Sequence, residues 1–517
     1  MIKKLFLYII IRELSEKIHI ILVITIFIWN WEDNEMLEKD ATIGNIKHEV
    51  LFKVAKLAYA GELAEKQDRI AYELIPGQKA NFRCCVYKER EIIRQRVLVA
   101  QGKAPSPKQK AENIIQIIPA ACEGCPITRF VVTDNCQKCM MKKCQQACHF
   151  KAITMLRDRA YIDPNNCKEC GKCSEACPYN AIADLMRPCR RSCPVDAISR
   201  DENNVVVIDE EKCIQCGNCI KNCPFGAIED RSSMTQVIDE IRKGKKVYAM
   251  VAPAGEGQFG SHVSMGVLAE AVKELGFTDM VEVALGADYV AKSEAEEWAE
   301  GYKEGKKMTT SCCPAFVKMI HKHFPQLVDN ISTTISPMAA TARLLREKDP
   351  DCLTVFIGPC IAKKGEIQDN KDTADYVLTF DELYAMLRAK EVQLATFGTN
   401  LQQGSIYGKR FANAGGVTKA VMEAFKEAEE EIDVKVKQCS GAAECKKALM
   451  LLKVNRLPED FVEGMACIGG CVNGPGNVKP EMLVKKDRET LLSHADDRTI
   501  EQSIEPYKDY KFSMHRE

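Results

Sequence analysis

The sequence is poor in two features that many binding functions require. Its 517 residues carry a formal net charge of only −1, and aromatic residues make up 7% of them, with three Trp. Binding to nucleic acid or to an anionic membrane usually needs an excess of basic side chains, and base stacking needs aromatic ones. We therefore expect neither nucleic acid nor a membrane surface as a main partner.

The sequence also lacks a long apolar run near its start. The run His19–Trp29 holds about a dozen residues, whereas a membrane-spanning helix needs about 20. Lys3 and Lys4 precede it, but no small-residue cleavage site follows, so a secretory signal peptide fits poorly. Met36 then opens a polar sequence. We interpret residues 1–36 as an apolar extension ahead of the true start at Met36, with a membrane-associated helix or an ordinary buried helix as alternatives.

Cysteine, by contrast, is abundant, with 26 residues. Such a number is typical of either a disulfide-rich secreted protein or a metal protein. Most of these cysteines lie in short C-x-x-C runs followed by Pro, within residues 121–231. This spacing favours iron–sulfur clusters, which need free thiolates and would supply much of the stability of the segment. We therefore expect a reducing, anaerobic cytoplasm.

Two runs match the spacing C-x2-C-x2-C-x3-C-P of a bacterial two-cluster ferredoxin, in which the last cysteine of each run binds the cluster of the other. They are Cys167, Cys170, Cys173 and Cys177, followed by Pro178, and Cys213, Cys216, Cys219 and Cys223, followed by Pro224. A looser run comprises Cys136, Cys139, Cys144 and Cys148, with His149 in place of the Pro. Two fragments, Cys122 with Cys125 and Cys189 with Cys193, together complete a fourth run.

These sixteen cysteines fit four [4Fe–4S] clusters if one ferredoxin-like unit, residues 127–186, is inserted inside the first motif of another. The inserted unit would use Cys136, Cys139, Cys144 and Cys177 for one cluster, and Cys148, Cys167, Cys170 and Cys173 for the other. The enclosing unit would use Cys122, Cys125, Cys189 and Cys223, and Cys193, Cys213, Cys216 and Cys219. The alternative is that Cys122 and Cys125 are structural and that one cluster is missing or incomplete.

The segments on either side of residues 121–231 have different patterns. Residues 37–120 carry apolar side chains at helical spacing up to Pro76–Gly77, which predicts a helical N-terminal region. In residues 235–517, β-like apolar runs alternate with helical ones, which indicates a large α/β domain. The predicted fold class is thus a multi-domain α/β protein with a helical N-terminal region, a nested ferredoxin-like (α+β) region with four clusters, and a large α/β C-terminal domain. The cysteines that match no motif are expected to be core thiols: Cys84, Cys85, Cys352, Cys439 and Cys445.

Three further cysteine motifs lie in the predicted α/β domain, at loop-like points after strands, where open α/β sheets usually carry their sites. They are TSCCPAF (Thr310–Phe316), GPCIAKKGE (Gly358–Glu366) and EGMACIGGCVNGPG (Glu463–Gly476). Together they contribute Cys312, Cys313, Cys360, Cys467 and Cys471. Four thiolates from three loops suit one more [4Fe–4S] cluster, and the fifth cysteine is then free for chemistry.

These motifs resemble the signature loops of the [FeFe]-hydrogenase catalytic domain, and the cysteine-rich region resembles that of the monomeric group B enzymes. The resemblance implies an H-cluster, in which a [4Fe–4S] cluster is joined to a diiron unit with CO, cyanide and an azadithiolate. It implies Cys313, Cys360, Cys467 and Cys471 as ligands, with Cys471 as the bridge to the diiron unit. It further implies Cys312 as the cysteine that passes protons to the bridging amine, Lys363 as a donor to a cyanide, and Met465, Pro253 and Ala254 as lining of the site.

The resemblance also implies a proton route. Glu294 and Glu297 lie three apart on one helical face, and Ser332 fits a polar relay between them. Gly301 stands where the family usually has an Arg that closes the route at the surface. The other departures leave the ligand set intact: Ala254 for Ser, Gly358 for Met, Met338 for Gln, Phe316 for Trp and Pro475 for Gly.

The function expected from the resemblance is reversible interconversion of protons, electrons and H2. The accessory clusters would exchange electrons with a ferredoxin or a similar soluble carrier, and hydrogenase maturation proteins would install the diiron unit. One alternative is a hydrogenase-like sensor of H2 or redox state, or a non-catalytic iron–sulfur assembly protein. Retention of Cys312, Lys363 and Met465 argues against the assembly type. The other alternative, a plain multi-cluster electron carrier, leaves the C-terminal cysteines without a purpose.

Overall fold

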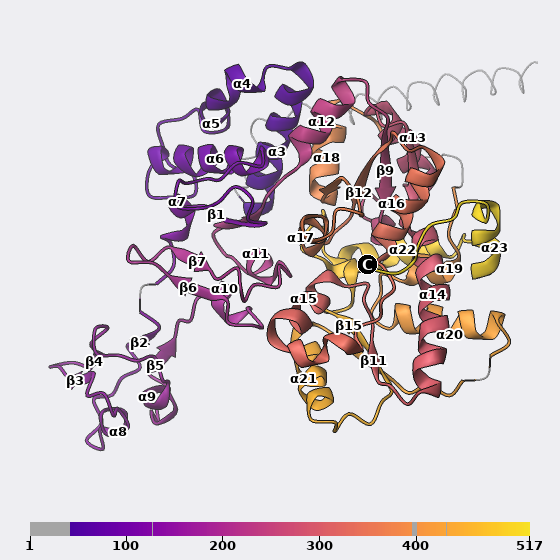
Figure 1. Cartoon of the computed structure of the whole chain (residues 1–517). Coiled ribbons are helices and arrows are strands. Elements are labelled where there is room, and N and C mark those ends of the chain that lie inside the picture. The colour runs from indigo at the N-terminus through magenta and orange to yellow at the C-terminus, as the bar shows by residue number, and fades with distance from the viewer. Residues whose placement is uncertain (1–41, 127, 395–400, 431, 517) are drawn as a thin grey trace, which may run out of the picture.

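The computed structural model describes residues 42–126, 128–394, 401–430 and 432–516 (Figure 1). The apolar extension predicted over residues 1–36 lies outside them, so its interpretation stays a prediction. No helix in the described ranges combines the length and the apolar character that crossing a bilayer demands.

The N-terminal region is helical, as the sequence predicted. Its elements are α3 (Ile43–Ala60), α4 (Leu63–Lys66), the 3-10 turn η1 (Gln67–Arg69), α5 (Ile70–Leu74) and α6 (Val86–Ala100). The side chain of Thr42 accepts a hydrogen bond from the backbone N–H of Asn45 and so caps the start of α3. The helix ends at Gly61, which has a φ of 76°, a left-handed conformation that favours glycine. The apolar pattern runs on beyond Gly61, so periodicity alone did not reveal this break.

Cys84 and Cys85 are exposed, so the prediction that they are core thiols was wrong. They belong to a loop whose backbone is tied to α6, because the carboxylate of Glu89 accepts the N–H groups of Asn81, Phe82 and Arg83. The buried residues of α6 begin only after this loop, at Val86. The prediction was correct for the others, since Cys352, Cys439 and Cys445 are buried.

The cysteine-rich region consists of two-stranded antiparallel sheets and one-turn helices. β1 (Ile115–Ile117) pairs with β8 (Ile228–Asp230), and β6 (Ile198–Arg200) pairs with β7 (Val206–Ile208). Between β1 and β6 in sequence, β2 (Phe130–Val132) pairs with β5 (Ile182–Asp184), and β3 (Ile153–Met155) pairs with β4 (Ala160–Ile162). The short helices are α7 (Pro119–Cys122), α8 (Lys143–Gln146), α9 (Lys172–Glu175), α10 (Pro188–Arg191) and α11 (Asn218–Lys221). The pairing is nested, and β2 to β5 project away from the rest of the molecule (Figure 1).

Two parallel sheets lie at the centre of the C-terminal part. The first has the order β10 (Asp279–Glu282), β9 (Val247–Val251), β12 (Leu353–Ile357), β13 (Tyr376–Leu378). The second has the order β11 (Met308–Thr309), β15 (Phe461–Met465), β14 (Val436–Ser440). All pairings within both sheets are parallel. The strands expected in KKVYAMVAPA and CLTVFIGPC are β9 and β12.

Helices surround these sheets, which gives the mixed helix and strand architecture that the sequence predicted (Figure 1). They are α12 (Met234–Arg242), α13 (Met265–Glu274), α14 (Val283–Lys303), α15 (Pro314–His323), α16 (Pro337–Lys348), α17 (Ala362–Asp369), α18 (Phe380–Ala389), α19 (Ile406–Arg410), α20 (Gly416–Glu427), α21 (Ala442–Lys453), α22 (Glu481–Leu492) and α23 (Ile500–Ile504). Four 3-10 turns complete the described set: η2 (Pro253–Gly255), η3 (Pro325–Asn330), η4 (Cys471–Asn473) and η5 (Glu505–Tyr507).

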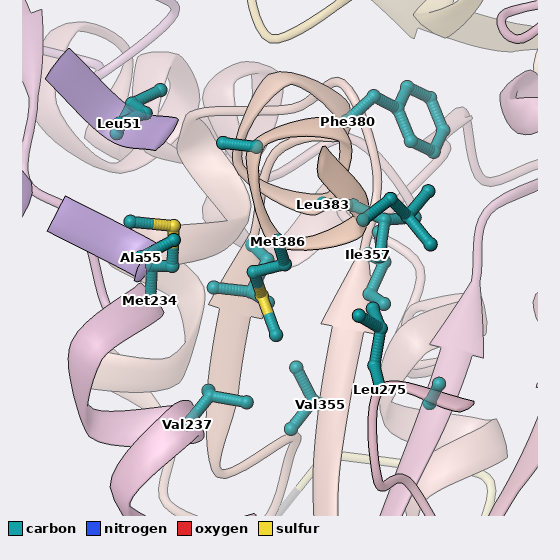
Figure 2. Packing of buried hydrophobic residues seen from close by; sticks show 14 of the residues in the cluster. Leu51, Ala55, Met234, Val237, Leu275, Val355, Ile357, Phe380, Leu383 and Met386 are labelled. Atoms are coloured by element: carbon teal, nitrogen blue, oxygen red, sulfur yellow. The ribbon is translucent and has the colours of Figure 1, made fainter. Parts of the chain in front are cut away.

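The N-terminal helices and the first sheet share one hydrophobic core. Figure 2 shows side chains from α3, α12, α18 and β12 packed together in it: Leu51, Ala55, Met234, Val237, Phe380, Leu383, Met386, Val355 and Ile357. A surface helix of a separate domain would not bury its residues among those of the central sheet. The helical region therefore stabilises the part of the chain that carries the three C-terminal cysteine motifs.

Candidate active site and cluster sites

The three C-terminal cysteine motifs meet where parallel strands end. β11 leads into Cys312 and Cys313, β12 leads into Cys360, and β15 leads into Cys467 and Cys471. Loops at the carboxyl ends of parallel strands gather at one edge of the sheet, which is why residues far apart in sequence converge here. They surround an apolar cavity of about 70 Å³.

Most of the residues predicted for the site line this cavity. They are Pro253, Ala254, Cys312, Cys313, Cys360, Lys363, Met465 and Cys471. The lining also includes apolar residues that sequence reasoning did not single out: Val283, Ala287, Pro337, Phe356, Phe411 and Ala412. These carry no chemical motif, so only the fold could identify them.

Burial dominates the electrostatics of the thiols at this cavity. It raises the pKa of Cys360 to about 11, and it also raises the pKa values of Cys467 and Cys471 well above the usual value of a thiol. Neighbouring thiolates act in the same direction, with Cys313 raising the pKa of each of these three groups. Buried thiols of this kind hold their protons unless bound metal cations replace them. The donor set therefore fits an iron–sulfur cluster.

Cys467 does not line the cavity, but it links the site to the cysteine-rich region. Its pKa is raised by burial and then by the nearby thiolates of Cys360, Cys471 and Cys313, and also by that of Cys216. The two regions are in close contact at this point, since a Cβ on Gly217 would lie 2.5 Å from Cγ of Pro475. Lys221 crosses the same boundary and donates from Nζ to Oδ1 of Asn473 over 2.7 Å. An electron route between the two regions would be short here.

Lys363 and Met465 approach the cavity from different elements. Lys363 lies in α17 and donates from Nζ to Oε2 of Glu366 over 2.7 Å. Met465 is the last residue of β15 and is buried. Pro253 and Ala254 form the turn η2 after β9. The cavity thus has a single cation, a thioether and a backbone turn around its cysteines.

The accessory cysteines form groups whose thiols raise one another's pKa. The pKa of Cys189 is raised by burial and by Cys223, Cys125 and Cys122. That of Cys144 is raised by burial and by Cys177, Cys139 and Cys136. Among the described residues, no three His, Cys, Asp or Glu side chains are grouped so as to hold a single metal ion. In a cluster each thiolate binds its own iron, so such convergence is not required.

The other two accessory groups have the same character. Burial raises the pKa of Cys216 to about 12, with Cys213 and Cys193 adding to the shift. Burial raises the pKa of Cys173 to about 11, with Cys167 and Cys170 adding to it. These neighbours are those of the predicted ligand sets. The ligation itself, including the place of Cys148 beside Cys167, Cys170 and Cys173, stays a prediction.

One hydrogen bond recurs at the last cysteine of every run. The thiol sulfur accepts the backbone N–H of an alanine four residues later. The bonds are Ala152 to Cys148 at 3.3 Å, Ala181 to Cys177 at 3.4 Å, Ala197 to Cys193 at 3.3 Å and Ala227 to Cys223 at 3.2 Å. A donor at the sulfur stabilises the thiolate. The run with His149 in place of Pro has this bond as well, so the substitution leaves the local turn intact.

Glu294 is fully buried in α14, close to Cys312. Its Oε1 accepts the backbone N–H of Ser311 over 3.3 Å, and its Oε2 has no hydrogen-bond partner in the described structure. Burial raises the pKa of Glu294 to about 8, and the nearby carboxylates of Glu297 and Glu463 add to the shift. Burial also raises the pKa of Cys312, with the charge of Glu294 as the next cause. Near neutral pH the carboxyl beside Cys312 is thus protonated.

Glu297 lies one turn further along α14 and is partly exposed. Its carboxylate accepts bonds from Oγ of Ser332 over 2.7 Å, from the N–H of Thr333 over 2.8 Å and from Oγ1 of Thr334 over 3.2 Å. Ser332 therefore contacts Glu297, whereas Glu294 is contacted by the backbone N–H and the hydroxyl group of Ser311.

Ser311 and Thr334 connect these two carboxyl groups, and sequence reasoning missed both. Oγ of Ser311 lies 3.5 Å from Oε1 of Glu294 and donates to the carbonyl of Thr334. Oγ1 of Thr334 bonds Glu297 and lies 2.9 Å from Oγ of Ser293. The sequence did offer a hint of these two residues, because Ser311 precedes Cys312 and Thr334 lies in the hydroxyl-rich stretch ISTTIS. The hint points to a proton route only once the fold brings residues 294, 311 and 334 together.

Three family models match the chain. They are the iron only hydrogenase large subunit, C-terminal domain, over residues 245–475, the LdpA Fe–S cluster-binding domain over residues 182–234, and the 4Fe–4S binding domain over residues 160–183. The first match spans all five cysteines of the C-terminal motifs.

Several similar proteins bear hydrogenase names. The chain is 32% identical over 393 residues to the periplasmic [Fe] hydrogenase large subunit of Nitratidesulfovibrio vulgaris, with 65% of this chain and 90% of that protein covered. It is 28% identical over 397 residues to iron hydrogenase 1 of Clostridium pasteurianum, with 65% and 69% covered. A more distant similarity, 22% over 302 residues, covers 48% of this chain and 67% of a Brugia malayi protein named "Probable cytosolic Fe-S cluster assembly factor Bm6838".

Proposed function

The chain belongs to the iron-only hydrogenase family, and on this premise we propose that it catalyses the reversible reaction 2H+ + 2e− ⇌ H2. The observation that carries the proposal is the convergence of Cys312, Cys313, Cys360 and Cys471 on one apolar cavity, with Glu294 buried beside Cys312. Membership of the family alone would not be enough, because the similarity extends to a protein named as an assembly factor.

The cavity and its thiols fit the cofactor of this family. Cys313, Cys360, Cys467 and Cys471 would hold a [4Fe–4S] cluster, with Cys471 as the bridge to a diiron unit in the cavity. The diiron unit, when bound, supplies the redox chemistry that makes and breaks the H–H bond. Lys363 would donate a hydrogen bond to an anionic ligand of that unit, because an ammonium group is a donor without acceptor capacity. The apolar lining keeps water away from the reacting groups.

The protein's own residues deliver the protons. The thiol of Cys312 faces the cavity and would give its S–H proton to the cofactor, after which the carboxylic acid of Glu294 returns a proton to the sulfur. Glu294 suits this task because its raised pKa keeps it protonated near neutral pH. Ser311, Thr334 and Ser332 supply hydroxyl groups between Glu294 and Glu297, and Glu297 is partly exposed to solvent.

The sixteen accessory cysteines would hold four [4Fe–4S] clusters that supply the electrons. Cys216 lies close to the active-site thiols, because its charge raises the pKa of Cys467. We propose a ferredoxin or a similar soluble carrier as the electron partner, maturation proteins as the source of the diiron unit, and the cytoplasm as the location. A hydrogenase-like sensor with the same site but little turnover is the second candidate. The presence of Cys312 and Lys363 at the cavity, with Glu294 close to Cys312, favours turnover.

The test is anaerobic H2 evolution with reduced methyl viologen, on protein loaded with a synthetic diiron mimic. We expect activity in the unaltered protein and a loss of about 100-fold or more in Cys312→Ser, the size expected when a positioned proton donor is removed. Cys84→Ser is the matched control, because Cys84 is exposed and far from the three motifs in sequence, and this variant should keep full activity.

Infrared spectra of bound CO and cyanide separate the remaining outcomes. Bands without H2 evolution would support the sensor and reject catalysis. Absence of the bands after loading would mean that the cavity does not hold the diiron unit, and the proposed function would then fail.

A further inference from the structure

At the surface end of the proton route, position 301 of α14 is a glycine and contributes no side chain. Gly301 lies one turn beyond Glu297 on the helix, and a Cβ at this position would collide with Sδ of Met308. Met308 is buried in β11 and fills the space. A long cationic side chain at position 301 would therefore have to displace the core.

A different segment lies beside residues 333–335, two of which bind Glu297. Residues 513–516 run antiparallel to residues 333–335, with a bridge between Thr334 and His515. The backbone N–H of Ile335 donates to the carbonyl of Met514 over 2.8 Å, and the N–H of Arg516 donates to the carbonyl of Thr333 over 2.9 Å. These bonds fix the segment next to the residues that bind the Glu297 carboxylate.

His515 is the titratable side chain that this segment presents at the surface. Its ring is exposed, and Nδ1 lies 2.8 Å from Oγ1 of Thr333. The same Thr333 donates its backbone N–H to Oε1 of Glu297 over 2.8 Å. One residue thus holds the Glu297 carboxylate on one side and the imidazole on the other.

The two arginines next to His515 donate their hydrogen bonds to backbone carbonyl groups. Arg343 of α16 donates from Nη1 to the carbonyls of Ser513 and His515. Arg516 turns inward, where Nη2 donates to the carbonyl of Ser311 over 2.8 Å. A guanidinium cannot release a proton in this pH range, whereas an imidazole can both bind and release one. His515 is therefore the group in this segment that can carry a proton.

We propose that His515 is the outermost proton carrier of the route, between solvent and Glu297, on a helix whose position 301 is a glycine. During H2 evolution an N–H bond of the imidazolium breaks, a water molecule relays the proton past Thr333, and an O–H bond forms on the Glu297 carboxylate. The neutral ring then takes a proton from a buffer acid or from water. During H2 oxidation the same steps run in reverse. The proposal rests on the proposed function and names a further residue that serves it.

The test follows the proton of Glu294 and does not require H2 turnover. At a pH below about 8 this carboxyl is protonated, so its C=O stretching band, identified by its loss in Glu294→Gln, should shift as the proton exchanges for deuterium. Exchange is followed after mixing into D2O, on the full chain with its accessory clusters and without the diiron unit. The variants are His515→Ala, which removes the ring, and His515→Asn, which keeps a hydrogen-bonding group for Thr333 but cannot carry a proton.

We expect exchange to slow by roughly tenfold in both variants, because loss of a positioned acid–base group is only partly replaced by water at the partly exposed Glu297. Millimolar imidazole should restore the rate. His494→Asn is the matched control and should exchange at the normal rate, because His494 is exposed in the turn after α22.

Each other outcome rejects the proposal. Normal exchange in both variants would show that protons bypass His515. Normal exchange in His515→Asn alone would show that the ring only holds Thr333 in place. Slow exchange that imidazole fails to restore would point to a disturbed segment 513–516. None of these results depends on the hydrogenase assay, so a failure here is distinct from a failure of the proposed function.

Discussion

At the scale of single residues, Glu294 is an acid that the folded protein keeps neutral. Its pKa in the folded chain is about 8, because burial raises it and the carboxylates of Glu297 and Glu463 add to the shift. In the unfolded chain the carboxyl group ionises near pH 4.5. The folded state therefore binds more protons than the unfolded state between these two values. By linkage, the contribution of this group to stability is fully present at low pH and is lost as the pH rises toward 8 and beyond.

The loss of this stability with rising pH leads to a prediction for Glu294→Gln. The amide cannot ionise, so the variant should be more stable than the original protein at high pH, by up to a few kcal/mol, and similar to it below the pKa of the unfolded group. H2 evolution should fall by about 100-fold or more, because the amide cannot pass a proton to Cys312. Thermal unfolding midpoints measured anaerobically across this pH range provide the check.

Glu296→Gln is the control for that comparison, because Glu296 lies on the same helix but is exposed. It should change neither the pH dependence nor the rate. A difference between Glu294→Gln and the original protein that stays constant with pH would show that Glu294 is not held neutral by the fold.

Residue-level prediction from sequence worked where spacing is local. The ferredoxin-like runs place cysteines within a few residues of one another, so the spacing already indicates which thiols become neighbours, such as Cys136, Cys139 and Cys144. Ser311, Thr334 and His515 could not be assigned in this way. Ser311 and Thr334 meet the glutamates of α14, and His515 meets Thr333, only through the tertiary fold. The exposed Cys84 and Cys85 were misjudged since a cysteine without a motif is buried in most proteins.

At the scale of elements, α15 and β15 are fixed to each other by a glycine. A Cβ on Gly464 of β15 would collide with the ring of Phe316 in α15, and that ring is fully buried. α15 begins directly after Cys313, and β15 leads to Cys467 and Cys471. The close approach of the two elements thus sets the distance between cysteines on different loops.

We predict that Gly464→Ala loosens the active-site cluster. The added methyl group must push the Phe316 ring aside at a cost of about 1 to 3 kcal/mol, and the shift of α15 should misplace Cys313. The measurement is iron content together with the thermal midpoint. Gly44→Ala is the matched control, because a Cβ at Gly44 meets nothing within 4 Å. It should slightly stabilise α3, since alanine favours helix over glycine.

A second substitution tests the cause. In the double variant Gly464→Ala with Phe316→Leu, the smaller side chain leaves room for the methyl group, and iron content should recover. If Gly464→Ala alone retains full iron content, the close approach does not control the site.

Element prediction from sequence succeeded for strongly periodic segments and failed at their ends. The alternation of β-like and helical runs after residue 235 reflects burial of whole strand and helix faces, which a single sequence displays directly. The end of α3 depends on one left-handed glycine, Gly61, inside a continuing apolar pattern. A helix end that depends on the conformation of one residue is easily missed when the apolar pattern continues past it.

At the scale of the whole molecule, the N-terminal helices belong to the core of the C-terminal part. Leu51 of α3 is buried among residues of α12 and α18 (Figure 2). We therefore predict that Leu51→Ala lowers stability by about 2 to 5 kcal/mol and that both parts still unfold in one transition. Leu483→Ala on α22 is the matched control, because Leu483 is 66% exposed. Two separate thermal transitions, with only the first shifted by Leu51→Ala, would contradict a shared core.

The number of accessory clusters is a second property of the whole chain. If Cys122, Cys125, Cys189 and Cys223 bind one [4Fe–4S] cluster, Cys125→Ser should lose about four iron atoms per chain. If Cys122 and Cys125 are structural, iron content should not change. Cys84→Ser, at an exposed thiol, should leave iron content unchanged in either case. Chemical iron analysis distinguishes the two arrangements.

The paired ends of the inserted unit have a consequence for how such chains can vary. The chain enters this unit through β2 and leaves it through β5, and the two crossings are held together where Leu185 donates its N–H to the carbonyl of Arg129 over 2.6 Å. Arg129 also pairs with Asp184 across the same strands. Everything between them is a cassette whose ends already touch. Besides these ends, Glu169 of the unit forms ion pairs with Arg190 and Arg200 of the enclosing unit, and we expect that such a unit can be lost or exchanged while its paired ends are kept. If this unit holds the two proposed clusters, the length of the proposed electron route can change with the unit while the C-terminal part stays as it is.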